Sequence, residues 1–180
     1  SDPEFLTAPV AVGSPAQLTE LGIPLSAQPK TEAYLFAYFE GRGDNMKQEQ
    51  IRFAISENGR DWKALNGNNP VLDSDVISNT GGVRDPHIMR GADGKSYYMV
   101  ATDMFTHKTG WGFNPGIVLM RSENLTDWTH SAIDFTKVYP EKFGNVQWVW
   151  APQTFYDVKE GKYLVYFTVK FKHNGYLDYY

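Results

Sequence analysis

The sequence contains no cysteine among its 180 residues. This absence excludes disulfide bonds, thiolate nucleophiles and cysteine-ligated zinc sites, and it leaves the redox compartment undetermined. Long hydrophobic runs are also missing. The longest candidates, residues 117–120 and 163–169, have the length of strands and fall short of the roughly 18 residues that a membrane span needs. We therefore expect no membrane partner.

Clusters of positive charge are equally scarce. The chain has 17 Lys and Arg against 21 Asp and Glu, a formal net charge of −4, and without a basic patch it is poorly suited to a phosphate backbone. We expect no nucleic-acid partner. The histidines show no metal-ligand spacing such as H-x-x-x-H, so no metal ligands are predicted. They are His87, His107, His130 and His173.

Aromatic residues, in contrast, are abundant at 15% of the chain. Such a content suits an all-β core, and it also suits a surface that stacks on sugar rings. The first thirty residues differ from the rest. Residues 1–5 (SDPEF) are typical of a vector-derived extension, and residues 6–30 are rich in proline. We interpret residues 1–30 as a leader and residues 31–180 as the folded domain.

From residue 34 onward, short apolar runs alternate with turn residues, which is typical of strands. These runs are residues 34–39, 51–56, 96–104, 117–122 and 162–169. Two patterns recur with one period. The sequence S-E-N followed by D-W occurs at residues 56–62 and again at 122–128, and the proline of V-R-D-P (Pro86) returns 66 residues later in V-W-A-P (Pro152).

A unit of about four short strands repeated at fixed spacing is the signature of a β-propeller blade. A β-sandwich is the alternative, but it has no reason to repeat the same turn chemistry in register. Trp62 and Trp128 hold one repeat position and are expected to pack between blades. The chain holds about two and a half blades, whereas a propeller closes a ring of at least about four. We therefore expect an incomplete propeller, either truncated or one piece of a cleaved or multi-chain protein.

Asp85 is the strongest catalytic candidate. It lies in the first strand of a blade, nearest the propeller axis, where side chains can project into the central funnel. Strand periodicity sends Asp85 and His87 to one face and Arg84 to the other. A carboxylate at the mouth of a funnel can act as a general base towards water. The competing interpretation is structural, since Asp-Pro is a common turn-starting dipeptide.

Taken together, V-R-D-P-H-I-M-R, D-G-K-S-Y-Y-M-V-A-T-D-M, the two S-E-N/D-W turns and W-A-P-Q-T-F-Y-D before G-K-Y resemble glycoside hydrolase family 43 over about residues 31–180. The resemblance implies a five-bladed β-propeller of the arabinofuranosidase, xylosidase or arabinanase kind. By motif, Asp85 matches the family's catalytic base, whereas the acid Glu and the tuning Asp are expected beyond Tyr180. The implied reaction is inverting hydrolysis, and one carboxylate cannot perform it alone. The isolated chain is therefore predicted to be inactive.

Five further residues are candidates for contacts with substrate. Asp103 ends a strand and is expected either to contact sugar hydroxyls or to brace a loop. Phe105 and Trp111 belong to a Gly-rich insertion that can reach over the rim of the funnel. Trp150 matches a family position close to the pocket, and Gln153 in the same strand can hydrogen-bond a hydroxyl.

The resemblance implies no required cofactor, although a structural Ca2+ near the axis occurs in the family. It implies a secreted or periplasmic bacterial protein with two kinds of partner: a plant cell-wall oligo- or polysaccharide, and the remainder of the propeller in the same or a separate chain. Two alternatives stay open. A fructan-cleaving propeller needs an upstream motif resembling W-x-N-D-P-N, which residues 6–82 lack. A catalytically silent propeller would only bind carbohydrate or protein.

Overall fold

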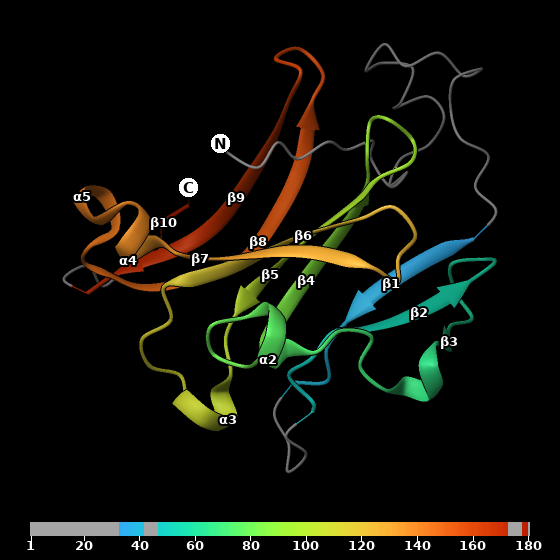
Figure 1. Cartoon of the computed structure of the whole chain (residues 1–180), viewed down its shortest axis with the longest axis horizontal. Coiled ribbons are helices and arrows are strands. Elements are labelled where there is room, and N and C mark those ends of the chain that lie inside the picture. Colours follow the sequence, from blue (N-terminus) through green and yellow to red (C-terminus); the bar gives the residue numbers. More distant parts are fainter. Residues whose placement is uncertain (1–32, 42–46, 173–177, 180) are drawn as a thin grey trace.

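The computed structural model describes residues 33–41, 47–172 and 178–179. The predicted leader, residues 1–30, lies outside these ranges. Strands dominate the described residues and form three antiparallel sheets (Figure 1). No helix in this part of the chain is long and apolar enough to cross a membrane.

Each sheet is a meander, because strands that follow one another in the sequence are hydrogen-bonded neighbours. The first sheet contains β1 (Tyr34–Tyr38), β2 (Arg52–Ser56) and β3 (Lys63–Ala64). The second contains β4 (Val83–Arg90), β5 (Tyr97–Asp103), β6 (Gly116–Ser122) and β7 (Trp128–Asp134). The third contains β8 (Val146–Asp157), β9 (Lys162–Phe171) and β10 (Asp178–Tyr179). The connections carry short helical segments, η2 (Asn66–Asn68), α2 (Ser74–Ile77), α3 (Thr106–Thr109), α4 (Phe135–Val138) and α5 (Pro140–Phe143).

The repeated S-E-N turns have the same hydrogen bonds in the first and second sheets. In the first turn, Ser56 Oγ and Asn58 Oδ1 each accept the backbone N–H three residues further on, at 2.9 and 2.9 Å. In the second turn, Ser122 Oγ and Asn124 Oδ1 accept the equivalent N–H groups at 2.8 and 2.8 Å. The 66-residue recurrence in the sequence is therefore one turn structure built twice.

Two apolar clusters hold the three sheets together. The first buries Phe53 of the first sheet with Met99 and Met120 of the second, and the second buries Val100 of the second sheet with Phe167 of the third. Strand β5 serves both clusters because successive side chains of a strand point to opposite faces of its sheet. The middle sheet is consequently packed on both faces.

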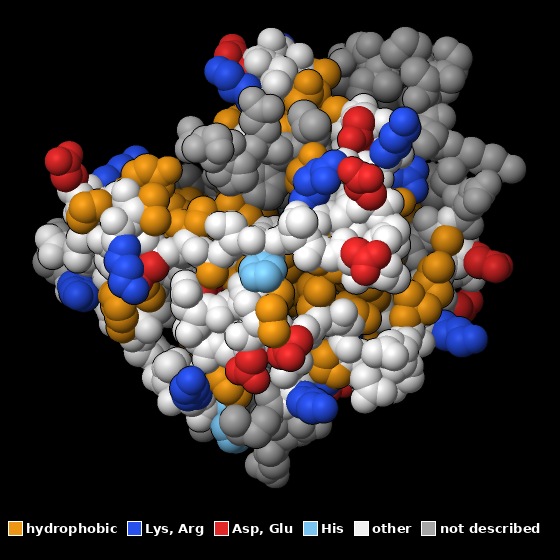
Figure 2. Space-filling model, in the orientation of Figure 1, with side chains coloured by type: hydrophobic (Ala, Val, Ile, Leu, Met, Phe, Trp, Pro, Cys, Tyr) orange, Lys and Arg blue, Asp and Glu red, His pale blue; other side chains and the backbone are white. Residues whose placement is uncertain are grey.

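These packed meanders confirm the predicted all-β architecture, an incomplete set of propeller blades that forms no closed ring within the described residues. Trp128 packs on the first cluster and lies 6.3 Å from the ring of Phe53, as expected for a residue between blades. Trp62 differs, because 43% of it is exposed. Its ring contacts Phe36 of the first sheet, at 5.5 Å between the ring centroids. On the side shown in Figure 2, Lys and Arg are scattered among Asp and Glu rather than gathered in a basic patch.

Candidate functional site

Asp85 lies in a β-bulge of strand β4. The register pairs Arg84 with Thr102 and His87 with Val100, so Asp85 and the proline after it face a single residue of β5. Because Thr102 and Val100 are two residues apart on β5, Arg84 and His87 lie on the same face of the sheet. The prediction that Arg84 lies on the face opposite His87 is therefore wrong. The extra residue of the bulge shifts the alternation by one.

The same irregularity occurs in β8 at Ala151, 66 residues after Asp85. The backbone φ angle is 51° at Asp85 and 48° at Ala151. This left-handed region costs an L-residue about 1–2 kcal/mol. Such strain persists only where the surroundings hold it, and it is concentrated at functional sites. The repeat therefore places a strained bulge in the first strand of both the second and the third sheet.

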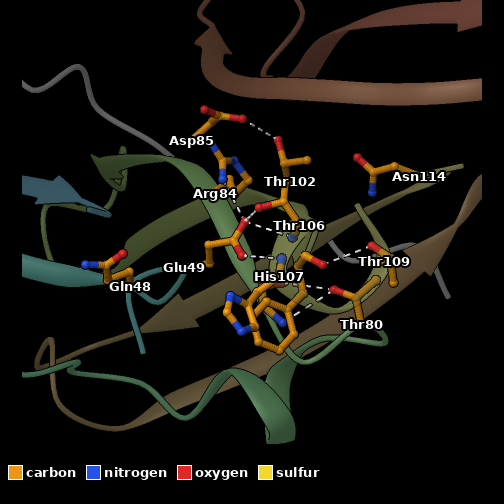
Figure 3. A network of polar contacts seen from close by, with 12 residues as sticks. Gln48, Glu49, Thr80, Arg84, Asp85, Thr102, Thr106, His107, Thr109 and Asn114 are labelled. Atoms are coloured by element: carbon orange, nitrogen blue, oxygen red, sulfur yellow. Dashed lines mark hydrogen bonds and ion pairs between the residues drawn. The ribbon is translucent and has the colours of Figure 1, made fainter. Parts of the chain in front are cut away.

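Thr102 connects the two bulges. Its hydroxyl donates to Asp85 Oδ2 at 2.9 Å and accepts the N–H of Ala151 at 2.9 Å. Figure 3 shows the Asp85 carboxylate directed at this hydroxyl. Asp85 itself is half-buried, whereas Thr102 is fully buried. The carboxylate is thus held by β5 and, through the hydroxyl, by the backbone of the neighbouring sheet.

Three indole rings, which we call the tryptophan cluster (Trp111, Trp148 and Trp150), lie beside the bulge of β8. The rings of Trp148 and Trp150 are stacked at 4.3 Å with 9° between their planes. Trp111 meets Trp150 edge-on at 6.3 Å and is half exposed. Asn114 Oδ1 accepts the indole N–H of Trp150 at 2.8 Å, which fixes the ring orientation. Of the predicted substrate contacts, Trp111 and Trp150 are thus brought together next to Asp85.

A buried ion pair contacts the ring of Trp111 through Arg84. The Arg84 guanidinium carbon lies 4.9 Å from the ring centroid of Trp111 and 4.6 Å from that of Phe39. Arg84 Nη1 also lies 2.6 Å from Glu49 Oε1, and both side chains are almost fully buried. The Glu49 carboxylate further accepts the N–H groups of Thr106 and His107 at the start of α3 (Figure 3). This network ties the insertion that carries Trp111 to the first and second sheets.

Glu49 is the most tightly bound carboxylate of the region. Burial on its own would raise the pKa of Glu49, but hydrogen bonds from Thr106, Arg84 and the backbone of His107 outweigh this effect and hold the pKa below its ordinary value of 4.5. The group is therefore ionised at neutral pH. A proton donor needs the opposite shift, so Glu49 is unsuited to the role of general acid.

Asp103 is also fully occupied by protein groups. It is 2% exposed, and its carboxylate accepts the N–H groups of Asn79 and Thr80 at 2.8 and 3.0 Å and the Thr80 hydroxyl at 2.7 Å. Of the two roles expected from the sequence, this geometry favours the bracing of a loop, here the loop before β4.

Phe105 was expected at the rim of the funnel, but its side chain is 6% exposed. A Cβ atom at Gly82 would lie 2.6 Å from the Cβ of Phe105, so the ring packs directly on a glycine backbone. Of the two aromatic residues predicted from the insertion, Trp111 reaches solvent and Phe105 does not.

Gln153 lies on the exposed face of the third sheet, where it accepts a hydrogen bond from the Tyr166 hydroxyl. It lines a groove of about 640 Å³ together with His87 and Phe36. Gln153 follows His87 by the 66-residue period, and the N–H of Thr154 donates to His87 Nδ1 at 3.3 Å, joining the second and third sheets. Burial lowers the pKa of His87, which suits a ring nitrogen that accepts. Gln153 therefore holds, in the third sheet, the position from which His87 of the second sheet contacts its neighbouring sheet, and this position is typical of a contact between blades.

Three polar residues of the site were not singled out from the sequence, namely Glu49, Thr102 and Asn114. Each acts through contacts with residues far along the chain, which single-sequence patterns do not reveal. Of the three, only Thr102 could have been recognised from the sequence, because Thr168 follows it by one repeat period. In the part of the chain that the structure describes, no group of three or more His, Asp or Glu side chains could hold a metal ion.

Comparisons with known proteins identify the family and the fold of the chain. Residues 29–177 match a family model related to glycoside hydrolase family 43, described as a probable glycosyl hydrolase domain. An α-L-arabinofuranosidase of Bifidobacterium longum subsp. longum is 25% identical over 178 residues, which cover 93% of this chain and 16% of that protein. The chain thus spans about a sixth of the length of this curated relative.

Among solved structures, an exo-β-1,3-galactanase from Clostridium thermocellum is similar to the chain, with a TM-score of 0.53 and 16% sequence identity. The similarity covers 85% of this chain and 32% of the galactanase chain. At this level of sequence identity, the similarity shows that the two chains share a fold and no more.

Proposed function

Because the chain belongs to the family of glycosyl hydrolase domains related to glycoside hydrolase family 43, we propose that it supplies the general base, Asp85, and part of the sugar-binding surface of an inverting glycosidase. The proposed substrates are arabinose- or xylose-containing polysaccharides of the plant cell wall. The arabinofuranosidase relative supports the arabinose assignment.

The position of Asp85 carries this proposal. Its carboxylate projects from a strained bulge in the first strand of a blade, where a hydrogen bond from Thr102 holds it. The same strained backbone recurs at Ala151, so it is a feature of the repeated blade. What distinguishes position 85 from position 151 is the carboxylate. A half-buried carboxylate with free acceptor capacity, held in place by a buried hydroxyl, is suited to removing a proton from water.

Inversion requires a second carboxyl group. One carboxylate activates water on one side of the anomeric carbon while a protonated acid donates to the leaving oxygen, about 6.5–9.5 Å away. The two nearby candidates, Glu49 and Asp103, are occupied by protein donors. We therefore place the acid Glu and the tuning Asp outside this chain, in the remainder of the propeller. The 180-residue chain alone should be inactive.

The tryptophan cluster would supply the binding surface. Indole faces stack on the apolar faces of furanose and pyranose rings, and Trp111 is half exposed next to Trp150. This chemistry requires no cofactor. A secreted or periplasmic location and a structural Ca2+ remain proposals that rest on the family resemblance.

The proposal can be tested with the Asp85→Asn variant of the catalytically active protein, assayed on 4-nitrophenyl α-L-arabinofuranoside and 4-nitrophenyl β-D-xylopyranoside. We expect kcat to fall by about 10²–10⁴-fold, the usual contribution of a general base. Asp75→Asn, which changes an exposed carboxylate in α2, should leave kcat unchanged. An undiminished kcat for Asp85→Asn would refute the assignment. Binding of arabino-oligosaccharides without any turnover would instead support a silent binding propeller.

A further inference from the structure

Thr102 is placed to orient the Asp85 carboxylate. It is 0% exposed in the middle sheet, and a threonine hydroxyl has one hydrogen to donate and two lone pairs to accept with. The N–H of Ala151 occupies a lone pair, and an amide N–H cannot accept. The single hydroxyl hydrogen is therefore directed at Asp85 Oδ2.

We infer that Thr102 is a positioning residue for Asp85, an inference that rests on the proposed function. Among the described residues, the Asp85 carboxylate accepts one hydrogen bond, which comes from Thr102 and reaches Oδ2. Oδ1 is then the oxygen left to receive the proton of the attacking water. As the water O–H bond breaks, the O–H bond at Oδ1 forms and the water lone pair attacks the anomeric carbon. The general acid protonates the departing oxygen.

The strain at Ala151 supports this role. Ala151 has no functional side chain, yet it adopts a φ of 48°. What this conformation provides is an N–H directed at the hydroxyl of Thr102. The bulge of the third sheet thus fixes the direction of a hydroxyl in the second, and the hydroxyl fixes the carboxylate. The position of the base is coupled in this way to the packing of the neighbouring sheet.

A purely structural role is the alternative, since Thr168 holds the equivalent position in β9 and pairs with Trp150 as Thr102 pairs with Arg84. In that case Thr102 would join two sheets without affecting turnover in the folded protein. The two roles predict different kinetics and can be separated by three variants. Thr102→Val removes the hydroxyl at constant shape, Thr102→Ser retains it, and Thr102→Ala is a second variant without the hydroxyl in case the valine protein does not fold.

The first measurement is amide hydrogen exchange at Ala151 in the 180-residue chain. Losing the acceptor of this N–H should speed its exchange by about tenfold in Thr102→Val, the equivalent of one hydrogen bond. Thr102→Ser should remain close to the wild type. Unchanged exchange in both hydroxyl-free variants would overturn the inference without any bearing on the proposed function.

The second measurement is steady-state hydrolysis of 4-nitrophenyl α-L-arabinofuranoside by the catalytically active protein. A displaced base should lower kcat by about 10–100-fold in Thr102→Val, with KM little changed, since small misplacements of reacting groups cost up to about 10²-fold. Thr102→Ser should restore most of kcat. In the Asp85→Asn background, Thr102→Val should have no further effect, because residues that act as a unit are not additive.

These outcomes separate the two claims. If Asp85→Asn lowers kcat while Thr102→Val lowers only the melting temperature, the positioning role is overturned and the proposed function stands. If Asp85→Asn leaves kcat unchanged, the proposed function itself fails.

Discussion

Removal of the charge of Glu49 should destabilise the protein far more than the same change in an exposed ion pair. Glu49 and Arg84 are 2.6 Å apart, with 3% and 11% of their side chains exposed. Glu123 and Arg121 are 2.7 Å apart, with 67% and 42% exposed. The two pairs therefore match in contact distance and differ in burial, so Glu49→Gln and Glu123→Gln form a controlled comparison.

The expected magnitude follows from what each substitution leaves behind. Breaking a buried ion pair by removing one partner costs about 3–5 kcal/mol, because the remaining charge is buried without compensation. In Glu49→Gln the new amide oxygen can still accept from the donors that face Oε1, but the amide nitrogen would face the N–H of His107, which now donates to Oε2. We expect a loss of about 3 kcal/mol, near the lower end of that range. Glu123→Gln should cost about 0–1 kcal/mol, as for exposed pairs.

Urea unfolding followed by tryptophan fluorescence measures both losses, and equal m-values would show that the two variants unfold from similarly compact states. For a chain of this size, about 3 kcal/mol corresponds to a fall of about 6–12 °C in Tm. If Glu49→Gln and Glu123→Gln cost the same within about 0.5 kcal/mol, burial would not strengthen the Glu49 network, and this network would not support the insertion that carries Trp111.

Ala151→Gly should leave the free energy of unfolding unchanged or raise it by up to about 1 kcal/mol, because glycine removes the penalty of the left-handed conformation. Ala101→Gly, in the regular and buried part of β5, should instead lower the free energy of unfolding by about 1 kcal/mol or more. Thermal unfolding of both variants checks this difference in sign. A further prediction concerns the pH dependence of stability. Because burial lowers the pKa of His87 in the folded state from 6.5, the unfolded chain binds this proton first, so stability should be constant above about pH 7 and decline as the pH falls below 6.5. His87→Gln should flatten that part of the stability profile in urea titrations at successive pH values, and an unaltered profile would contradict the role of His87.

The sequence was sufficient to predict the sheet architecture, because the repeat depends on local chemistry. The side chains of Ser56 and Asn58 each accept from a backbone N–H only three positions further on, so the same letters 66 positions later predict the same turn. The alternation around Asp85 was predicted incorrectly because a bulge is defined by the partner strand, which pattern reading does not include. The buried network at Glu49 could not be predicted for the same reason, since its donors lie 35 to 58 residues further along the chain.

The three carboxylates near the bulge differ in how much of their acceptor capacity the protein uses, and this difference bears on the proposed role of Asp85. A carboxylate offers about four acceptor sites. Glu49 accepts four hydrogen bonds and Asp103 accepts three, whereas a single one to Asp85 is found among the described residues. A carboxylate whose lone pairs are filled by protein donors is stabilised as an anion but has little capacity left to accept a proton from water. Under the proposed function, Asp85 is the carboxylate that keeps the capacity to accept a proton from water. Sequence motifs alone cannot separate these cases, because the donors that fill Glu49 and Asp103 come from distant parts of the chain.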